Sequence, residues 1–309
     1  MASEGNGRSV AAADAGRGVM QKSVLLGASG RVGALMLPAW PDAAGGAVPP
    51  PVAVRRDGRG GLSWDALDAD PPPPLPGPPP VAVLGFAGVT PGPAAPLHLN
   101  AALGRAAVRA AAAWGARHAF VASSAAVYGR PGADPVSEDA AARPESPYGR
   151  AMLEREDAVS RAAAAAGIAV TLLRIGNVAG ASEPFVSAAG RDPVVMDVFA
   201  DGRGPMRSYV GPAGLARVLA GLIALAAEGR PLPRLLNLGG RAPAEMNAVL
   251  TALGRPFATR PAPPAALPRM HLDTSRLEGL CPGAAGSGAA ADLVAELRSL
   301  ATAGQEGDA

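Results

Sequence analysis

Gly27, Gly30 and Gly33 have the spacing of a turn that binds a pyrophosphate. They follow a short apolar run at 24–26, and a helical pattern begins at Arg31 and stops at Pro38. Glycines in such a turn let backbone N–H groups approach a pyrophosphate at the positive end of a helix. The spacing alone is a weak signal in a chain with 40 glycines, but the strand–turn–helix context strengthens it. The sequence therefore predicts a dinucleotide site.

The elements that would position this turn alternate between strands and helices. Apolar runs typical of buried strands continue at 51–54, 81–84, 119–122, 168–175 and 235–238. Helical patterns occupy 97–114, 147–165, 213–227, 243–253 and 289–300. The second of these has Ser146 as a candidate N-cap and Pro147 in its first turn. This alternation predicts an α/β fold, a Rossmann doubly wound parallel sheet with a smaller C-terminal substrate lobe.

Arginines follow the second expected strand, where dinucleotide-binding folds carry an acidic residue for the adenosine ribose. Arg55 and Arg56 would suit a 2′-phosphate, which favours NADP. The alternative is that both are ordinary exposed charges, so the cofactor is predicted as NAD or NADP. Farther along, the proline-rich stretch 70–80 cannot be helical. We interpret it as an extended, solvent-facing connection, with a proline-rich docking ligand as the alternative.

Composition excludes several classes of protein. The 309 residues are 49% hydrophobic with net charge +2, and no basic run or aromatic-interleaved patch suits nucleic acid. The single cysteine, Cys281, forms no intrachain disulfide or cysteine zinc cluster. His98, His118 and His271 lack metal-ligand spacing, so we expect surface or helix-packing roles and no metal site. The most apolar helical segment, 215–227, is too short to span a membrane. With no signal peptide in 1–20, the expected location is cytoplasmic.

Further motifs occur in a characteristic order along the chain. Gly85-Phe86-Ala87-Gly88-Val89 and Ser123-Ser124-Ala125-Ala126-Val127-Tyr128-Gly129 each follow a strand, and Tyr148-Gly149-Arg150-Ala151-Met152 opens a helix. Leu173-Arg174-Ile175-Gly176-Asn177-Val178-Ala179-Gly180 and Arg207-Ser208-Tyr209-Val210 come next. Over roughly 23–240, this set resembles the extended short-chain dehydrogenase/reductases, and more closely the NAD-dependent epimerase/dehydratase family typified by UDP-glucose 4-epimerase.

The resemblance implies roles at matching positions. It implies a small-molecule, sugar-nucleotide-like substrate, an NAD(P) cofactor and a catalytic pair, Ser124 and Tyr148. It also implies that Asn177, Arg207 and Ser124 contact the substrate. The residues that it places around the cofactor are Gly27, Ser29, Gly30, Arg31, Val32, Gly33, Arg55, Arg56, Asp65, Phe86, Ala87, Gly88, Asn100, Ser123 and Tyr148. The alternative for Arg174 and Arg207 is a surface ion pair.

Tyr148 could exchange the proton of a substrate hydroxyl while Ser124 holds the same oxygen. Family sites carry a lysine four residues after the tyrosine, which lowers the tyrosine pKa. Here that residue is Met152, and the only lysine in the chain is Lys22. Free tyrosine titrates near ~10, so only about one in a thousand is ionised at neutral pH without help. Arg155 shares the helix face of Tyr148, about two turns along.

Three functions remain open on this basis. The first is an NAD(P)-dependent epimerase/dehydratase-type oxidoreductase, the second is a non-catalytic NAD(P)-binding sensor or assembly protein, and the third is a structural remnant. We expect 1–20 to be a flexible tail and 21–180 an NAD(P)-binding Rossmann domain, to which 211–240 returns. Residues 181–210 and 241–309 would form the substrate-binding lobe. The alanine-rich helices 97–114 and 147–165 would support a homodimer.

Overall fold

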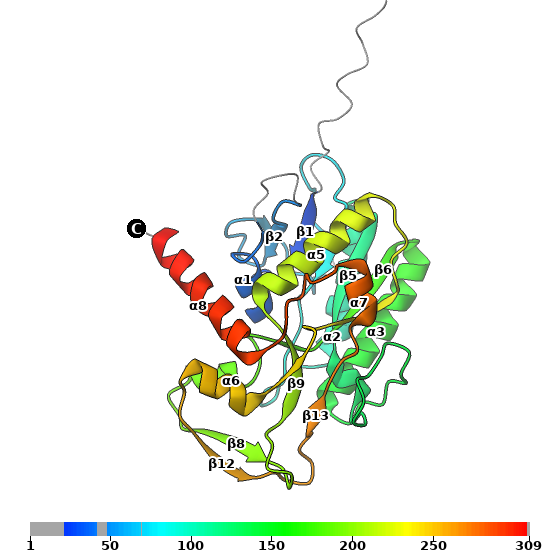
Figure 1. Ribbon diagram of the computed structural model, residues 1–309. Coiled ribbons are helices and arrows are strands. Elements are labelled where there is room, and N and C mark those ends of the chain that lie inside the picture. Colours follow the sequence, from blue (N-terminus) through cyan, green and yellow to red (C-terminus); the bar gives the residue numbers. More distant parts are fainter. Residues whose placement is uncertain (1–21, 42–47, 69, 308–309) are drawn as a thin grey trace, which may run out of the picture.

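The computed structural model describes residues 22–41, 48–68 and 70–307, so the expected tail at 1–20 lies outside the described residues. A seven-stranded sheet forms the centre, in the order β10-β6-β5-β4-β1-β2-β3, and every neighbouring pair is parallel (Figure 1). The predicted doubly wound parallel sheet is confirmed. Its strands are β1 Ser23–Leu26, β2 Val52–Arg55, β3 Leu62–Ser63, β4 Ala82–Gly85, β5 His118–Ser124, β6 Ala169–Ile175 and β10 Leu235–Leu238.

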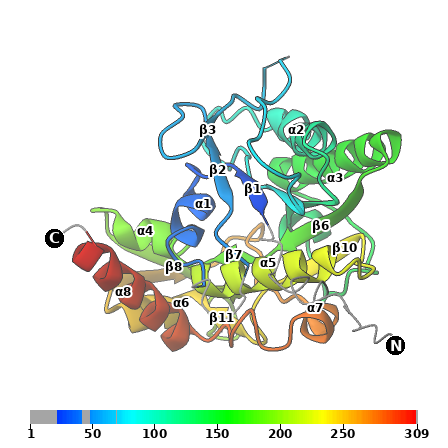
Figure 2. The same ribbon diagram turned by 90° about the horizontal axis from the view of Figure 1, so that it is seen from above.

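Helices cover both faces of this sheet. Helices α2, Leu99–Ala113, and α3, Pro147–Ala166, lie on one side, and α5, Pro212–Ala227, lies on the other (Figure 2). The short helix α1, Arg31–Met36, packs against α5. Because both faces are covered, β1 and β4 are buried at every residue and read as continuous apolar runs.

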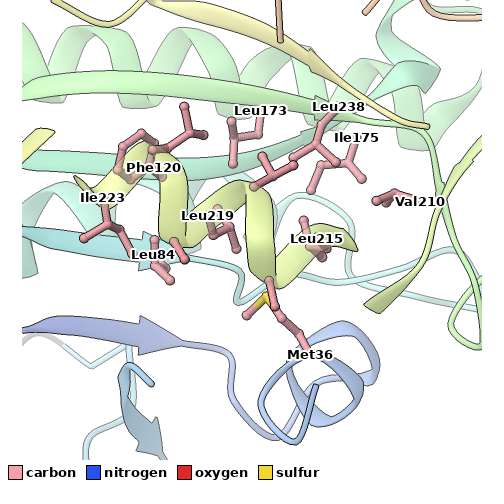
Figure 3. Packing of buried hydrophobic residues seen from close by; sticks show 14 of the residues in the cluster. Met36, Leu84, Phe120, Leu173, Ile175, Val210, Leu215, Leu219, Ile223 and Leu238 are labelled. Atoms are coloured by element: carbon pink, nitrogen blue, oxygen red, sulfur yellow. The ribbon is translucent and has the colours of Figure 1, made fainter. Parts of the chain in front are cut away.

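The larger core lies under α5. Leu215, Leu219 and Ile223 of this helix lie in one cluster with Phe120, Leu173 and Ile175 of the central strands (Figure 3). All six side chains are buried. Burial of such a side chain stabilises the fold by about 1.5–3 kcal/mol relative to exposure.

The start of α3 is fixed by the residues that the sequence predicted. The Ser146 hydroxyl accepts a hydrogen bond from the Gly149 N–H at 3.0 Å, and Pro147 occupies the first turn. Gly167 ends the helix in the left-handed conformation, at φ 66°. The cap therefore fixes the start of α3, with Tyr148 in its first turn.

Helices α2 and α3 pack closely along their alanine-rich faces. A Cβ added at Gly104 of α2 would lie 2.7 Å from Val159 Cγ2 of α3, so this crossing requires glycine. Ala107 and Ala111 are fully buried against the sheet and α3. The small side chains on these faces therefore pack α2 against α3 and the sheet within one chain.

The connection from β2 to β4 contains no helix in its described part, 56–68 and 70–81. Its prolines are mostly exposed, although Pro72 and Pro80 are buried. Trp114 fastens the segment by donating to the Pro73 carbonyl at 2.8 Å, and Trp64 packs edge-on against Trp114. The segment is therefore an extended connection held at fixed points.

The remaining residues form small sheets and helices beyond the central sheet. Strand β9, Met206–Val210, pairs with β7, Asn177–Val178, with β11, Pro243–Glu245, and with β13, Arg269–Met270. Strands β8, Val194–Val198, and β12, Phe257–Pro261, form a second pair beside α6, Met246–Leu253 (Figure 1). Helices α4, Phe185–Ala189, α7, Ser275–Leu280, and α8, Ala290–Gly307, complete this part.

Several predicted bounds in this region were wrong. Residues 243–245, expected to begin a helix, form β11 because they pair with β9. Strand β12 was not predicted, and four of its five residues are exposed, so its sequence lacks a strand pattern. His118 was also misplaced, because it lies buried in β5 and shares a hydrogen bond with Thr171 at 3.0 Å. In the described part of the chain, every helix falls short of the combined length and apolarity that a membrane crossing requires.

Candidate functional site

A cleft of about 1020 Å³ opens at the carboxyl edge of the sheet, where the chain leaves β1 and β4. These neighbouring strands mark the point at which the strand order reverses, which is where ligands bind in open α/β sheets. The cleft brings together every site residue nominated from the sequence, from Gly27 in the first turn to Arg207 in β9.

The glycine turn is shaped by close backbone packing. Gly27 has φ +93°, and a Cβ there would lie 2.4 Å from the Ala87 amide nitrogen. A Cβ at Gly33 would lie 2.4 Å from the Gly27 carbonyl oxygen. At Gly30 the side-chain position faces the cleft, with only the Gly27 oxygen nearby, at 3.2 Å. The turn is therefore compact behind and open in front, which fits the close approach of a pyrophosphate to the backbone.

The loop after β4 forms the opposite wall of the cleft. Asn100 on α2 holds it, accepting from the Val89 N–H at 2.9 Å and donating to the Val89 carbonyl at 3.0 Å. Arg31, at the start of α1, donates to the Thr90 hydroxyl at 2.7 Å. Because the amide of Asn100 is engaged in this way, its observed part in the site is to fix the loop.

At the end of β2, the arginines have different surroundings. Arg55 donates to the Arg59 carbonyl at 2.6 Å, whereas Arg56 is exposed at the edge of the cleft. Asp65 accepts from the Leu67 N–H at 3.0 Å and also lines the cleft. Arg56 is therefore the arginine whose guanidinium is better placed to meet a ligand.

Ser124 and Tyr148 face the cleft from adjacent elements. Ser124 ends β5, and its hydroxyl accepts from the Ala126 N–H at 3.2 Å. Burial raises the pKa of Tyr148, while the Ser124 hydroxyl and then the charges of Arg155 and Arg31 act in the opposite direction. The phenol is therefore neutral at neutral pH and has a donor and two cations in its surroundings.

Met152 lies one helical turn after Tyr148 and is 4% exposed. It packs among apolar side chains that include Val127 and Leu272, and it also lines the cleft. Lys22 precedes β1 and donates to the Pro76 carbonyl, and it does not contribute to the cleft lining. Position 152, which is a lysine in the epimerase/dehydratase family that the sequence resembles, therefore carries an apolar side chain in this protein.

A buried polar network supports the cleft from behind. Glu156 on α3 accepts from the Ser123 hydroxyl at 2.5 Å and from Arg174 Nε and Nη2 at 2.9 and 2.8 Å. The Arg174 guanidinium lies 4.6 Å from the ring centroid of Tyr128, whose hydroxyl donates to Asn237 Oδ1 at 2.7 Å. The alternative considered for Arg174, a surface ion pair, is wrong, because the pair that it forms with Glu156 is buried and both charged side chains are 6% exposed.

Asn177 and Arg207 lie on the side of the cleft that faces the smaller sheets. Asn177 donates to the Glu183 carbonyl at 3.0 Å. Arg207 donates to the carbonyls of Met206 and Leu267 at 2.7 and 2.9 Å, and burial lowers its pKa. The surface ion pair was wrong for Arg207 also, because its hydrogen bonds go to carbonyl groups in a partly buried setting.

Arg155 was considered from the sequence only as a distant neighbour of Tyr148. It is 1% exposed and lines the cleft. Its Nη1 donates to the Ala87 carbonyl at 2.7 Å, and its Nη2 donates to the Gly85 carbonyl at 2.8 Å. The sequence feature that could have identified Arg155 as a site residue is its position three residues after Met152, on the same face of the helix.

Comparisons with known proteins identify a family that part of the chain matches and structures that share its fold. Residues 90–192 match the NAD dependent epimerase/dehydratase family. A UDP-glucose 4-epimerase of Corynebacterium glutamicum is 42% identical over 69 residues, which are 22% of this chain and 21% of that protein. The matched segment thus spans about a fifth of the length of this curated relative.

Solved structures match over nearly the whole chain. A UDP-glucose 4-epimerase from Bifidobacterium longum, in complex with NAD+ and UDP, has a TM-score of 0.69 at 18% identity, covering 91% of this chain and 98% of that one. The Stenotrophomonas maltophila enzyme, with NAD and formylated UDP-arabinopyranose, has a TM-score of 0.69 at 20% identity, covering 93% and 99%. The chain thus has the fold of the UDP-glucose 4-epimerases and related extended short-chain dehydrogenase/reductases, and its residues 90–192 match the NAD dependent epimerase/dehydratase family.

Proposed function

We propose that this protein is an NAD(P)-dependent oxidoreductase of the epimerase/dehydratase type. It would act on a carbinol carbon of a sugar-nucleotide or another small polar substrate. The observation that carries the proposal is one cleft in which the Gly27–Gly33 turn and the Ser124–Tyr148 pair meet at the same edge of the sheet. The match of 90–192 to the family supports it.

The protein's own residues would bind, orient and exchange a proton. A nicotinamide ring bound in the cleft would accept or return a hydride at the substrate carbon. Ser124 would hold the oxygen on that carbon, and the Tyr148 phenol would move its proton. The open face of Gly30 would admit the pyrophosphate, and Asn100 would keep the opposite wall in place.

The substrate lobe is proposed as 181–210 and 241–309, with 21–180 and 211–240 forming the cofactor domain. Strand β10 lies beside β6 in the central sheet, which supports the return of 211–240. Asn177 and Arg207 are proposed to contact the substrate from the lobe side of the cleft. Support comes from a relative solved with UDP-glucose and NAD, which has a TM-score of 0.67 at 21% identity.

A non-catalytic NAD(P)-binding role is the second candidate, and Met152 favours it. This buried thioether supplies neither charge nor hydrogen-bond donor, and burial raises the pKa of Tyr148. A sensor or assembly protein would keep the cofactor without turnover.

The two functions are separated by changing Tyr148 to phenylalanine. For an enzyme, Tyr148→Phe lowers turnover at least about 100-fold, because the proton-transfer group is lost. Mass spectrometry of the small molecule released on denaturation identifies the cofactor. Turnover of UDP-sugars is followed by chromatography of the products, because a hydride that is taken and then returned leaves no net change in nicotinamide absorbance. Tyr128→Phe makes the same chemical change outside the cleft lining. Because it also removes the buried hydrogen bond to Asn237, the fold of each variant is verified by circular dichroism before turnover is compared. Tight cofactor binding that persists with no activity in the unaltered protein would favour the sensor.

We also propose a homodimer through the outer faces of α2 and α3. The exposed charges of both signs on these faces, such as Arg105 and Asp157, could pair across such an interface. Light scattering coupled to gel filtration would give the mass, and a monomeric mass at micromolar concentration would rule out the dimer.

A further inference from the structure

Arg155 is a buried cation that pairs with no carboxylate among the residues that the structure describes. It is 1% exposed, and its hydrogen bonds go to the carbonyls of Gly85 and Ala87. Its Nε has no hydrogen-bond partner, and none of the ion pairs found in the described ranges involves it. Burying an uncompensated charge is costly, and such groups concentrate at functional sites.

The neighbouring helix leaves space for this side chain. A Cβ at Gly104 on α2 would lie 2.9 Å from Arg155 Cγ, so a larger residue would displace the arginine. Arg155 and Tyr148 lie two turns apart on one face of α3 and line the same cleft, and the charge of Arg155 acts on the phenol. A Cβ at Gly88 would lie 3.4 Å from Arg155 Nη1, which places the charge next to Gly88 in the lining of the cleft.

The other groups around this site do not neutralise the charge. Glu156, the next residue on α3, is engaged with Ser123 and Arg174. Ser124 of β5 and Asn100 of α2 are neutral, and Arg31 of α1 is exposed and cationic. The field that Arg155 exerts on the phenol is therefore not cancelled by a nearby carboxylate.

The ionisation of Arg155 is consistent with a charged role. Burial lowers the pKa of Arg155 to about 10, so it is protonated at neutral pH, and the negative phenolate of Tyr148 acts to raise it. The charge of Arg155 in turn lowers the pKa of Tyr148. Each group thus stabilises the charged form of the other.

We propose that Arg155 is the positioning residue that replaces the lysine missing at Met152. Its buried positive charge stabilises the phenolate of Tyr148 from the lining of the same cleft, and its guanidinium holds the segment 85–88. The inference rests on the proposed function in one respect, which is that Tyr148 moves the substrate proton.

The ionisation of residue 148 tests this without any cofactor. Difluorotyrosine, an analogue that ionises closer to neutral pH, is placed at Tyr148, and its pKa is measured by fluorine NMR in the intact protein. Arg155→Met should raise that pKa by about one unit, which is a tenfold loss of phenolate at a given pH. Arg155→Lys, which keeps the charge but loses the fork, should stay within about 0.3 unit. Arg150→Met is the control, because Arg150 is closer in sequence but exposed.

An unchanged pKa in folded Arg155→Met would overturn the inference. So would a rise of one unit in Arg155→Lys, which would assign the effect to the fork and not to the charge. If Arg155→Met does not fold, the inference is tested with Arg155→Lys and with the double variant Met152→Lys/Arg155→Met. The double variant should bring the pKa of residue 148 back toward its value in the unaltered protein. Turnover and dinucleotide binding are measured separately, so a protein without turnover can still show the pKa shift. An active protein without the shift refutes only the role of Arg155.

Discussion

Met152 defines the chemical problem of this site at the scale of one residue. A thioether four residues after Tyr148 leaves the phenol without a neighbouring donor on that turn. The Met152 side chain packs with Val127 and Leu272, so an apolar residue at this position lies in an apolar pocket. The site therefore gains packing at the point where it lacks a charge.

Replacing Met152 by lysine should tighten dinucleotide binding. The new ammonium would reach the cleft that Met152 lines and donate to a ribose hydroxyl, so we expect an affinity increase of about tenfold, or faster turnover. Isothermal titration calorimetry with NAD and NADP measures the affinity. Met152→Leu, which keeps the apolar pocket, is the control. If Met152→Lys neither tightens dinucleotide binding nor speeds turnover, residue 152 does not face the nicotinamide ribose.

The site could be predicted from the sequence where motif and element coincide. Gly27, Ser124 and Tyr148 each stand at the junction of a strand or helix with a loop, so their meeting at the sheet edge follows from the parallel topology. Arg155 could not be predicted in this way. Arg155 can be buried because Gly104, on helix α2, has no side chain to occupy the same space. No local sequence pattern reveals that contact between two helices.

At the scale of elements, the buried network joins α3 to β5 and β6. Glu156 links Ser123 of β5 to Arg174 of β6, and the two charged side chains are 6% exposed. Breaking a buried pair leaves one charge uncompensated, which costs about 3–5 kcal/mol. Glu156→Gln should therefore lower the free energy of unfolding by about 3 kcal/mol, measured by urea denaturation. The exposed Glu154 of the same helix provides the control, Glu154→Gln. Equal stability of the two variants would contradict the account.

His118 makes the pairing of β5 with β6 sensitive to acid. Thr171 donates its hydroxyl to the Pro233 carbonyl at 2.7 Å, so it accepts from His118 Nε2, and the ring is neutral. Burial lowers the pKa of His118 to about 4 from 6.5. Because the pKa of His118 is lower in the folded state than in the unfolded chain, the unfolded chain takes up the proton first as the pH falls. The stability contributed by the neutral, buried ring is therefore complete above about pH 6.5 and is lost as the pH falls toward 4.

A glutamine at this position isolates the histidine. Between about pH 7.5 and pH 5, the unaltered protein should lose about 2 kcal/mol more stability than His118→Gln, which keeps a donor but does not titrate. Urea denaturation at both pH values measures the difference. His98→Gln, at an exposed position, should follow the unaltered protein. Parallel pH curves for His118→Gln and the unaltered protein would show that the buried ring is not responsible.

Element type was predictable for six strands of the central sheet, but not for the two-residue strand β3, and it was less predictable outside that sheet. Strands such as β4 are buried on both faces, so their apolar runs are visible in the sequence. Strands β11 and β12 form because partners distant in the chain, β9 and β8, offer backbone groups to pair with. Such tertiary pairing overrides local propensity, which explains the errors in the C-terminal part.

At the scale of the whole molecule, a dinucleotide that binds the native cleft must stabilise the entire fold. At a free concentration of about one hundred times Kd, binding adds about 2.7 kcal/mol to the free energy of unfolding. For a chain of this size, we expect a rise in Tm of roughly 4 °C. Differential scanning calorimetry with NAD and with NADP measures the rise. Arg56→Ala should reduce the rise with NADP and leave the rise with NAD unchanged if Arg56 binds a 2′-phosphate.

The decisive variant for this linkage is Gly30→Val. Gly30 has φ −71° and ψ 160°, a conformation that valine adopts readily, and its side-chain position opens into the cleft. The variant should therefore keep the unliganded Tm within a few degrees and lose the rise produced by either dinucleotide. Gly279→Val, at an exposed position outside the cleft lining, should retain the full rise. If Gly30→Val still gains stability from the dinucleotide, the ligand binds elsewhere on the molecule, because a valine side chain and a pyrophosphate cannot occupy the mouth of this turn together.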